Sequence, residues 1–354
     1  MRLRSIALAT ATAIVLGACG TPDSEQSSQP PATSEDLTES TSLTVVTHDS
    51  FTLPEELLAQ FEERSGLEVT YVQPGDGGAL VNQLILTRDS PLGDVVYGID
   101  NSYATRAIHQ GVISPYESPA LPEESNHFVV EGLVPIDFGD VCINADVQYF
   151  EDNDLPVPTN LDYLIDPDYA DMLVVPNPAA SSPGLSFMLA TIGAVGEEEW
   201  LDYWAQLRDN GLLVVSGWSE AYYGEFSGAG EGGERPLVVS YATSPAFTLT
   251  EDGDQTTTVA LLGTCFRQVE YAGVIEGAQN ETGAREFIDF LLSDDVQAAL
   301  PESMFMYPVV QDTELPPDWV QFAPLSDNPI YMEPELISEH RDRWVQEWTD
   351  VVLG

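Results

Sequence analysis

The sequence contains no lysine, so its 11 Lys and Arg residues are all arginines. Against these stand 59 acidic residues, which give a formal net charge of −48 at pH 7. A nucleic-acid-binding surface needs a basic patch to neutralise phosphates, and this chain has too few positive charges to build one. Binding to nucleic acid is therefore excluded. A glycine-rich phosphate loop that ends in lysine is excluded as well.

The residue patterns of catalytic and metal centres are also missing. The four histidines are scattered, with no pair at metal-ligand spacing, at positions His48, His109, His127 and His340. There is no Gly-x-Ser-x-Gly elbow. Paired carboxylates occur throughout the chain, so their presence does not favour one function over another. We expect a binding protein with no metal and no cofactor rather than an enzyme, and an extracellular hydrolase is the alternative from another class.

Long apolar runs are absent except near the N-terminus, where Ser5 to Leu16 follows a basic start. This run is shorter than the roughly 20 residues that a membrane-spanning helix needs. It is typical of a cleaved signal segment, and its Leu16-Gly17-Ala18-Cys19 ending resembles a bacterial lipobox. We predict a signal peptide over residues 1–19 and lipidation of Cys19, which places the chain on the outer face of the cell membrane. An ordinary signal peptide with an incidental Cys19 is the alternative.

Residues 20–42 have one large apolar side chain, Leu37, among Ser, Thr, Pro, Glu, Gln and Asp. Such a segment cannot bury enough surface to offset its chain entropy, and we predict a disordered tether. From residue 43 the composition is globular. The roughly 310 residues that remain exceed what one core organises comfortably, so two lobes are expected.

Only three cysteines are present, and lipidation of Cys19 would leave Cys142 and Cys265. In an oxidising compartment a disulfide between these two is the economical interpretation. Two unpaired buried thiols are the alternative.

The acid excess has two interpretations. Loss of the signal peptide would remove Arg2 and Arg4 and take the formal net charge from −48 to −50. Such a charge could concentrate a cationic ligand near the protein. It could equally be an adaptation of the whole surface to a saline habitat. The second interpretation is favoured because the acidic residues are spread over every segment.

Two successive series of strands and helices predict an α/β fold. The first series has strands over 43–47, 67–72 and 94–98, with helices over 53–65 and 79–86. The second series has strands over 172–175, 212–215 and 237–241, with helices after Pro183 and over 218–226. Further helices are expected over 284–292, 294–300 and 333–352. Two such series predict two lobes, with a ligand site beyond the carboxyl ends of the strands.

Two Ser-Pro helix starts follow strands of the second series, at Ser182-Pro183 and Ser244-Pro245. Serine caps helices and proline suits the first helical position, while the free amides at a helix start attract an anion or a hydroxyl. Plain capping is the alternative for each start. The occurrence of both after strands favours a shared ligand site.

Three further features carry open alternatives. Trp218 and Tyr222, just after a strand, could stack on a flat or cationic ring or could pack in the core. Asp100, at the end of another strand, could face a positive ligand or could cap the next helix. The adjacent pair Tyr222-Tyr223 also fits an iron-binding receptor, which gives a second hypothesis about the ligand.

Several segments together resemble the bacterial thiamine-binding proteins, which are receptors of thiamine ABC transporters. They occur in the family's order and cover nearly the whole chain from Leu43. The matching segments are Asp49-Ser50-Phe51, Asp76-Gly77, Asn82-Gln83-Leu84, Gly98-Ile99-Asp100-Asn101, Asp137-Phe138-Gly139, Ser181-Ser182-Pro183-Gly184-Leu185, Gly217-Trp218-Ser219-Glu220-Ala221-Tyr222, Ser240-Tyr241-Ala242-Thr243-Ser244-Pro245-Ala246, Met306-Tyr307-Pro308-Val309 and Trp344-Val345-Gln346-Glu347-Trp348.

This resemblance implies a two-lobed type II periplasmic-binding-protein fold with a ligand site between the lobes. It implies a first lobe over 43–139 and 270–303 and a second lobe over 140–269 and 304–354. The fold is similar to that of ferric-ion receptors, so the fold alone does not choose between thiamine and iron. Cys142 and Cys265 lie near the expected hinge crossovers.

The resemblance also implies the ligand and its contacts. Thiamine or a thiamine phosphate is the expected ligand, an ABC permease with its ATPase is the expected partner, and the receptor itself is expected to be a monomer. The implied ligand-binding positions are Asp76, Gly77, Ser181, Ser182, Trp218, Tyr241, Ala242, Thr243 and Ser244. Possible further contacts are Asp100, Tyr222, Phe247 and Phe305.

Overall fold

A computed structural model describes residues 41–229 and 232–354 of the chain. The predicted signal peptide, the lipidation site Cys19 and residues 20–40 of the predicted tether lie outside the described residues. Ser42, the last residue of the predicted tether, is the first residue of strand β1. No helix in the described part combines the length and apolar character needed to cross a membrane.

The described strands form one continuous sheet in the order β2-β1-β3-β10-β5-β8-β6-β7, and three further short strands pair with its central strands, β9 and β11 with β5 and β4 with β10. The predicted strands of both series are confirmed. The strands are β1 Ser42–Thr47, β2 Glu68–Val72, β3 Val95–Asp100, β4 Ile113–Ser114, β5 Val134–Asp146, β6 Leu173–Pro176, β7 Leu213–Val215, β8 Leu237–Tyr241, β9 Thr258–Ala260, β10 Phe266–Ile275 and β11 Tyr307–Pro308.

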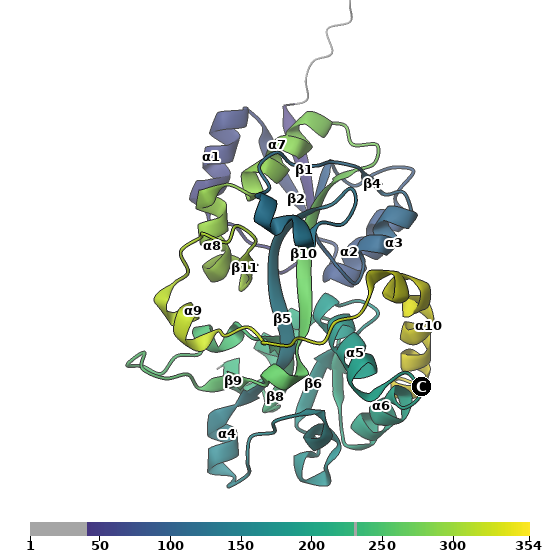
Figure 1. The fold of residues 1–354 in the computed structure, drawn as a ribbon, viewed down its shortest axis with the longest axis vertical. Coiled ribbons are helices and arrows are strands. Elements are labelled where there is room, and N and C mark those ends of the chain that lie inside the picture. Colours follow the sequence, from purple (N-terminus) through teal and green to yellow (C-terminus); the bar gives the residue numbers. More distant parts are fainter. Residues whose placement is uncertain (1–40, 230–231) are drawn as a thin grey trace, which may run out of the picture. The chain divides into compact units, whose positions relative to one another are not determined.

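Strand direction divides this sheet into two α/β halves. Strand β1 pairs in parallel with β2 and β3, and β6 pairs in parallel with β7 and β8. Between these groups, β10 and β5 are antiparallel to each other and to their outer neighbours. Both central strands are long and extend from one half to the other (Figure 1). We call the β2-β1-β3 half the first lobe and the β8-β6-β7 half the second lobe.

Helices cover the sheet of each lobe, as parallel strands buried on both faces require (Figure 1). α1, α2, α3, α7 and α8 lie with the first lobe, and α4, α5 and α6 with the second. The helices are α1 Glu55–Ser65, α2 Gly77–Leu86, α3 Ala104–His109, α4 Val147–Asp152, α5 Ser182–Val195, α6 Trp200–Asp209, α7 Glu281–Leu291, α8 Asp294–Met304, α9 Pro317–Phe322 and α10 Pro334–Val352.

Local sequence explains where several helices begin and end. The Ser181 side chain accepts a hydrogen bond from the Gly184 amide, and Pro183 lies in the first turn of α5. Helix α1 ends at Gly66, whose φ of 72° lies in the left-handed region that favours glycine. The helix predicted over residues 218–226 differs, because Glu220–Glu225 forms a π-helical turn. Such turns often occur at functional sites, and periodicity does not reveal them.

The C-terminal helix α10 packs against both lobes. It contacts α6 of the second lobe and α3 of the first. Trp348 is fully buried with its ring centroid 5.4 Å from that of Trp204, and the Arg341 guanidinium lies 4.4 Å from the centre of the Tyr103 ring. These contacts combine aromatic burial with a cation–π interaction. Helix α10 therefore connects the two lobes through contacts outside the central strands β5 and β10.

A disulfide joins Cys142 in β5 to Cys265, which immediately precedes β10. Both cysteines are buried, and their small apolar cluster includes Ala242. The bond crosslinks the two strands that connect the lobes. It closes a covalent loop over a sequence separation of 123 residues.

Removal of this crosslink should lower stability. A crosslink of this span restricts the unfolded chain, so Cys142→Ala with Cys265→Ala should reduce the free energy of unfolding by about 2–4 kcal/mol. Urea denaturation of both proteins without reductant measures the difference. Equal stability of the double variant and the wild type would contradict the prediction, as would two reactive thiols in the denatured, unreduced wild type.

Candidate functional site

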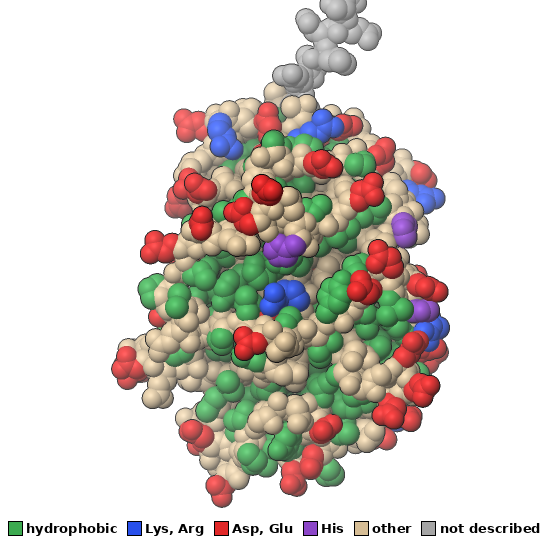
Figure 2. All heavy atoms as spheres, viewed as in Figure 1, with side chains coloured by type: hydrophobic (Ala, Val, Ile, Leu, Met, Phe, Trp, Pro, Cys, Tyr) green, Lys and Arg blue, Asp and Glu red, His purple; other side chains and the backbone are tan. Residues whose placement is uncertain are grey.

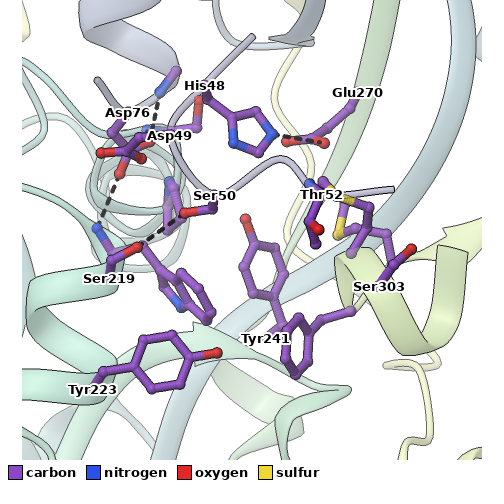
Figure 3. A pocket seen from close by; sticks show the side chains of 17 residues that line it. His48, Asp49, Ser50, Thr52, Asp76, Ser219, Tyr223, Tyr241, Glu270 and Ser303 are labelled. Atoms are coloured by element: carbon purple, nitrogen blue, oxygen red, sulfur yellow. Dashed lines mark hydrogen bonds and ion pairs between the residues drawn. The ribbon is translucent and has the colours of Figure 1, made fainter. Parts of the chain in front are cut away.

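A cavity of about 270 Å³ opens between the two lobes, at the carboxyl ends of their strands. Its size lies just below the roughly 300–1,000 Å³ of typical small-molecule pockets. Figure 3 shows side chains from both lobes directed into it. The lining residues are His48, Asp49, Ser50, Thr52, Asp76, Gly77, Ser182, Pro183, Trp218, Ser219, Tyr223, Tyr241, Glu270, Ser303, Met304, Phe305 and Met306.

Asp76 links the two lobes at one end of this cavity. It precedes α2 in the first lobe, and its Oδ1 accepts the Gly77 amide at 2.6 Å. The same carboxylate also accepts two amides from the second lobe, those of Ser182 at 3.2 Å and Trp218 at 3.0 Å. Burial raises the pKa of Asp76, although hydrogen bonds from the Trp218 amide and the Ser181 hydroxyl offset part of the rise.

Close packing at this junction requires glycine at position 77. A β-carbon on Gly77 would lie 2.1 Å from the hydroxyl oxygen of Ser182. Any larger residue would displace the Ser182 hydroxyl from its contact with Asp100. The pair Asp76-Gly77 therefore acts as a unit, with a carboxylate that binds the second lobe and a backbone that allows it to approach.

Asp100 is placed behind the cavity rather than in it. The residue ends β3, and its carboxylate accepts the Ser102 amide at 2.6 Å and the hydroxyl groups of Ser102 and Ser182. Burial raises the pKa of Asp100 to about 6, against the opposing effect of these hydrogen bonds. Asp100 thus provides a second contact between the lobes, through Ser182, and does not line the cavity.

Aromatic rings form one side of the cavity. Trp218 lines it and stacks on Tyr222 with a centroid separation of 5.2 Å and an interplanar angle of 13°. The Trp218 indole N–H donates to the Ser240 hydroxyl at 2.9 Å, which fixes the ring. Tyr223 and Tyr241 also line the cavity, whereas Tyr222 is buried behind Trp218. The adjacent tyrosines Tyr222 and Tyr223 therefore do not both face the cavity, as a shared metal site would require.

The other expected positions support the lining residues from behind. The Ser244 hydroxyl lies 2.8 Å from the Ser240 hydroxyl. It therefore helps to fix Ser240, which accepts the hydrogen bond from the Trp218 indole. The Thr243 hydroxyl donates to the Phe305 carbonyl at 2.6 Å, and Phe305 lines the cavity. Phe247 packs on Phe305 with a centroid separation of 4.0 Å. Ser181 caps α5, and Ala242 packs beside the disulfide.

A buried ion pair that the sequence did not reveal completes the cavity. His48 Nε2 lies 3.6 Å from Glu270 Oε2, and Figure 3 shows the two side chains facing each other. Burial alone would lower the pKa of His48, but the carboxylates of Glu270, Asp76 and Asp49 together outweigh burial and raise it above 6.5. Burial would raise the pKa of Glu270, but His48 and the Tyr97 hydroxyl lower it overall.

The second buried carboxylate of this network is that of Asp137. Burial and the neighbouring charge of Glu270 raise the pKa of Asp137 well above its usual range. The Tyr97 hydroxyl contacts both Asp137 and Glu270. Because a phenol has one proton to donate, the Tyr97 hydroxyl donates to one of these two carboxylates at a time. The opposite directions of the two pKa shifts favour the negative charge on Glu270, the carboxylate that lines the cavity.

The charge of the lining favours a cation. The described lining residues include three carboxylates, from Asp49, Asp76 and Glu270, and no arginine. His48 is their one basic group, and it is already paired with Glu270. The described residues contain no group of three or more His, Cys, Asp and Glu that could hold a metal ion. The cavity thus combines aromatic faces, hydroxyl groups and negative charge, as an organic cation would require.

The sequence pointed to only part of this lining. His48, Asp49 and Ser50 follow β1 in a segment that marked the resemblance, but their approach to Glu270 depends on tertiary folding. Glu270 lies on a hinge strand with no local motif, and 59 acidic residues hide any single one of them. Ser303 to Met306 enters the cavity at the end of α8, where Phe305 adopts a φ of 60°.

The two-lobed sheet, the paired central strands and the cavity between the lobes define a type II periplasmic-binding-protein fold, as the sequence predicted. The chain belongs to the bacterial extracellular solute-binding proteins, whose family model matches residues 90–327. It is a binding protein rather than an enzyme, and its place is outside the cytoplasm.

Its relatives narrow the class further. The chain is 29% identical over 314 residues to the thiamine-binding periplasmic protein of Brucella suis, covering 86% of this chain and 90% of the relative. A solved structure of a periplasmic thiamin binding protein matches with a TM-score of 0.76 at 27% identity, covering 88% and 96% of the two chains. An apo ferric-ion-binding protein of Pasteurella haemolytica shares the fold alone, with a TM-score of 0.66 at 14% identity.

The raised pKa of His48 predicts a pH-dependent contribution to stability. A histidine whose folded pKa exceeds its unfolded value of 6.5 stabilises the fold fully below that value. The contribution is lost as the pH rises through the folded pKa. His48→Gln should therefore lower the free energy of unfolding by about 3 kcal/mol at pH 6, where a buried charge loses its partner, and by less at pH 9.

Urea denaturation of both proteins at the two pH values measures this change. His109→Gln, which alters an exposed histidine at the end of α3, is the matched control. A deficit for His48→Gln that is the same at pH 6 and pH 9 would show that His48 is not charged in the fold.

Proposed function

We propose that this chain binds thiamine outside the cytoplasm and delivers it to an ABC import permease. The observation that carries the proposal is the aromatic and negatively charged cavity between the lobes, which contains no arginine. Thiamine has a flat aminopyrimidine ring and a cationic thiazolium ring. The relatives whose names state thiamine binding match the chain across both lobes.

Each part of the ligand has a suitable counterpart in the cavity. The rings of Trp218, Tyr223 and Tyr241 offer faces for stacking and cation–π contact. The carboxylates of Asp76 and Glu270 suit the thiazolium charge. Hydroxyl groups of Ser50 and Ser219, whose oxygens lie 3.1 Å apart across the lobes, suit the polar edge of the pyrimidine or the hydroxyethyl group.

Transport follows from movement of the lobes about the central strands. We propose boundaries at residues 139–140, 269–270 and 303–304, so that each of β5 and β10 contributes to both lobes. The closed form, in which Asp76 binds amides of the second lobe, is the form that a permease would recognise. If the protein is a monomer tethered by lipid on Cys19, its two lobes and their cavity would stay at the membrane surface.

The thiamine proposal predicts saturable binding that Trp218 reports. Isothermal titration of thiamine into the protein should give a dissociation constant of about 1 μM or below, as expected of a ligand enclosed by two lobes. Thiamine should also change the tryptophan fluorescence, and Trp218→Phe should abolish most of that change. Trp200→Phe, a buried substitution in α6, is the control that should retain it.

No heat with thiamine or with either of its phosphates would refute the thiamine proposal. A coloured complex with ferric ion that Tyr223→Phe abolishes would instead support an iron receptor. Measurement of the visible spectrum after addition of ferric citrate separates these two outcomes.

The proposed anchor predicts the location of the mature protein. In a bacterial host, the wild type should sediment with membranes, because acyl chains on Cys19 hold it there. Cys19→Ser should appear in the soluble extracytoplasmic fraction with its thiamine binding intact. Fractionation and mass spectrometry of the N-terminal peptide test this, and an unlipidated Cys19 in the wild type would contradict it.

A further inference from the structure

One basic group lies among the carboxylates that line the cavity. Of the described lining residues, His48 alone carries a basic side chain, and its Nε2 lies 3.6 Å from Glu270 Oε2. Both side chains are buried. A buried charge is stable only when it is paired, so protonated His48 and Glu270 neutralise each other. A carboxylate that would attract a cationic ligand is therefore already engaged by the protein.

The fold holds the His48 ring in this position. The ring packs against Gly98 of β3, where a β-carbon would lie 2.3 Å from His48 Cδ2, so only glycine leaves room for it. The Tyr97 ring lies beside it with a centroid separation of 5.7 Å. The His48 carbonyl accepts the Phe51 amide at 3.2 Å, which fixes the backbone. These contacts keep the ring next to Glu270.

The pair does not depend on contact between the lobes, because both residues belong to the first lobe. His48 follows β1, and Glu270 pairs in register with Asp100 of β3. Glu270 Oε1 also accepts the Gln268 amide at 3.0 Å, and the Tyr97 hydroxyl lies 2.8 Å from Oε2. A cation that is to pair with Glu270 must therefore enter the cavity and replace protonated His48.

Other titratable groups lie on the elements around His48. Burial raises the pKa values of Tyr97 and Tyr241 above their usual range, so neither phenol ionises near neutral pH. Asp100 has a pKa of about 6, so the pH dependence of binding does not by itself identify His48. The full set is Asp49 of the same loop, Asp76 before α2, Tyr97 and Asp100 of β3, Asp137 of β5, Tyr241 of β8 and Glu270 of β10.

We propose that His48 gives up its proton when a cationic ligand binds, because the ligand and protonated His48 compete for Glu270. This inference rests on the proposed function and adds the charge state of the receptor. The proton leaves to solvent, and the positive charge of the ligand takes its place beside the carboxylate. Two cations next to one carboxylate would repel each other strongly in a site shielded from water. Ligand binding and proton binding are therefore linked, and each weakens the other.

The sign of the pH dependence follows from this competition. Below the pKa of His48, which lies above 6.5, the ligand must displace a proton, so its affinity falls as the pH falls. Above that pKa, His48 is already neutral and Glu270 is free to pair with the ligand. The affinity for thiamine should therefore rise by about threefold or more between pH 6 and pH 8.5, with a plateau at the upper end.

Nitrogen-15 NMR of the imidazole groups reads the charge of His48 directly. The sequence has four histidines, and the signal that is lost in His48→Gln belongs to His48. At pH 6, His48 should be charged without thiamine and predominantly neutral with saturating thiamine. His109 and His127 are exposed, so their signals should stay unchanged and serve as internal controls.

Calorimetry counts the released proton. Titration of thiamine at pH 6 in MES and in bis-Tris buffer, whose ionisation enthalpies differ, should give heats that differ by the release of up to about one proton per ligand. His109→Gln should release as many protons as the wild type. Glu270→Gln removes the carboxylate for which the two cations compete, so it should bind thiamine about tenfold more weakly and release fewer protons.

A charged His48 in the thiamine complex would overturn the inference, and so would a neutral His48 at pH 6 without thiamine. In both cases saturable binding of thiamine would leave the proposed function standing. If thiamine does not bind at any pH between 6 and 8.5, the proposed function fails and the inference fails with it. Should His48→Gln not fold, substitution of the other three histidines in turn assigns the remaining signal to His48.

Discussion

One buried carboxylate binds the two lobes to each other beside the cavity. Asp76 is covalently part of the first lobe, but two of the three amides that it accepts belong to the second lobe. An unpaired buried charge is costly, so Asp76 stabilises the arrangement in which those amides reach it. The glycine that follows it and the serine cap of α5 are local sequence features that make this approach possible. The contact between the lobes and part of the negative charge at the cavity therefore come from the same carboxylate.

A second buried network, on the hinge strands, sets the charge on the opposite side of the cavity. His48 and Tyr97 lower the pKa of Glu270 in β10, whereas burial and the charge of Glu270 raise the pKa of Asp137 in β5. Two carboxylates so close together cannot both ionise without a large cost. The hinge thus holds its electrostatic state through side chains that also contact the ligand cavity, so movement of β5 relative to β10 would disturb that state.

The sequence predicted those features of the fold that depend on local pattern. The β-branched strands, the serine cap of α5 and the glycine after Asp76 were all visible, and together with the resemblance they located the cavity. The sequence did not show which residues of a segment line the cavity and which lie behind it. Trp218 and Tyr222 belong to one aromatic segment, but only Trp218 lines the cavity, because the π-helical turn places Tyr222 behind it. Glu270 was missed because its partners lie far away in sequence.

The overall acidity and the acidity of the cavity act at different ranges. On the face that Figure 2 shows, acidic side chains are scattered rather than gathered in one patch. Exposed charges are screened beyond about 10 Å at 0.1 M salt, and more closely in a saline medium. Such charges can keep the protein solvated, but they cannot decide which ligand remains bound. Asp76 and Glu270 are held between the lobes within reach of the ligand, where salt does not replace their contacts. The charge that a ligand would meet inside the cavity is therefore set by a few buried oxygen atoms and not by the net charge of −48.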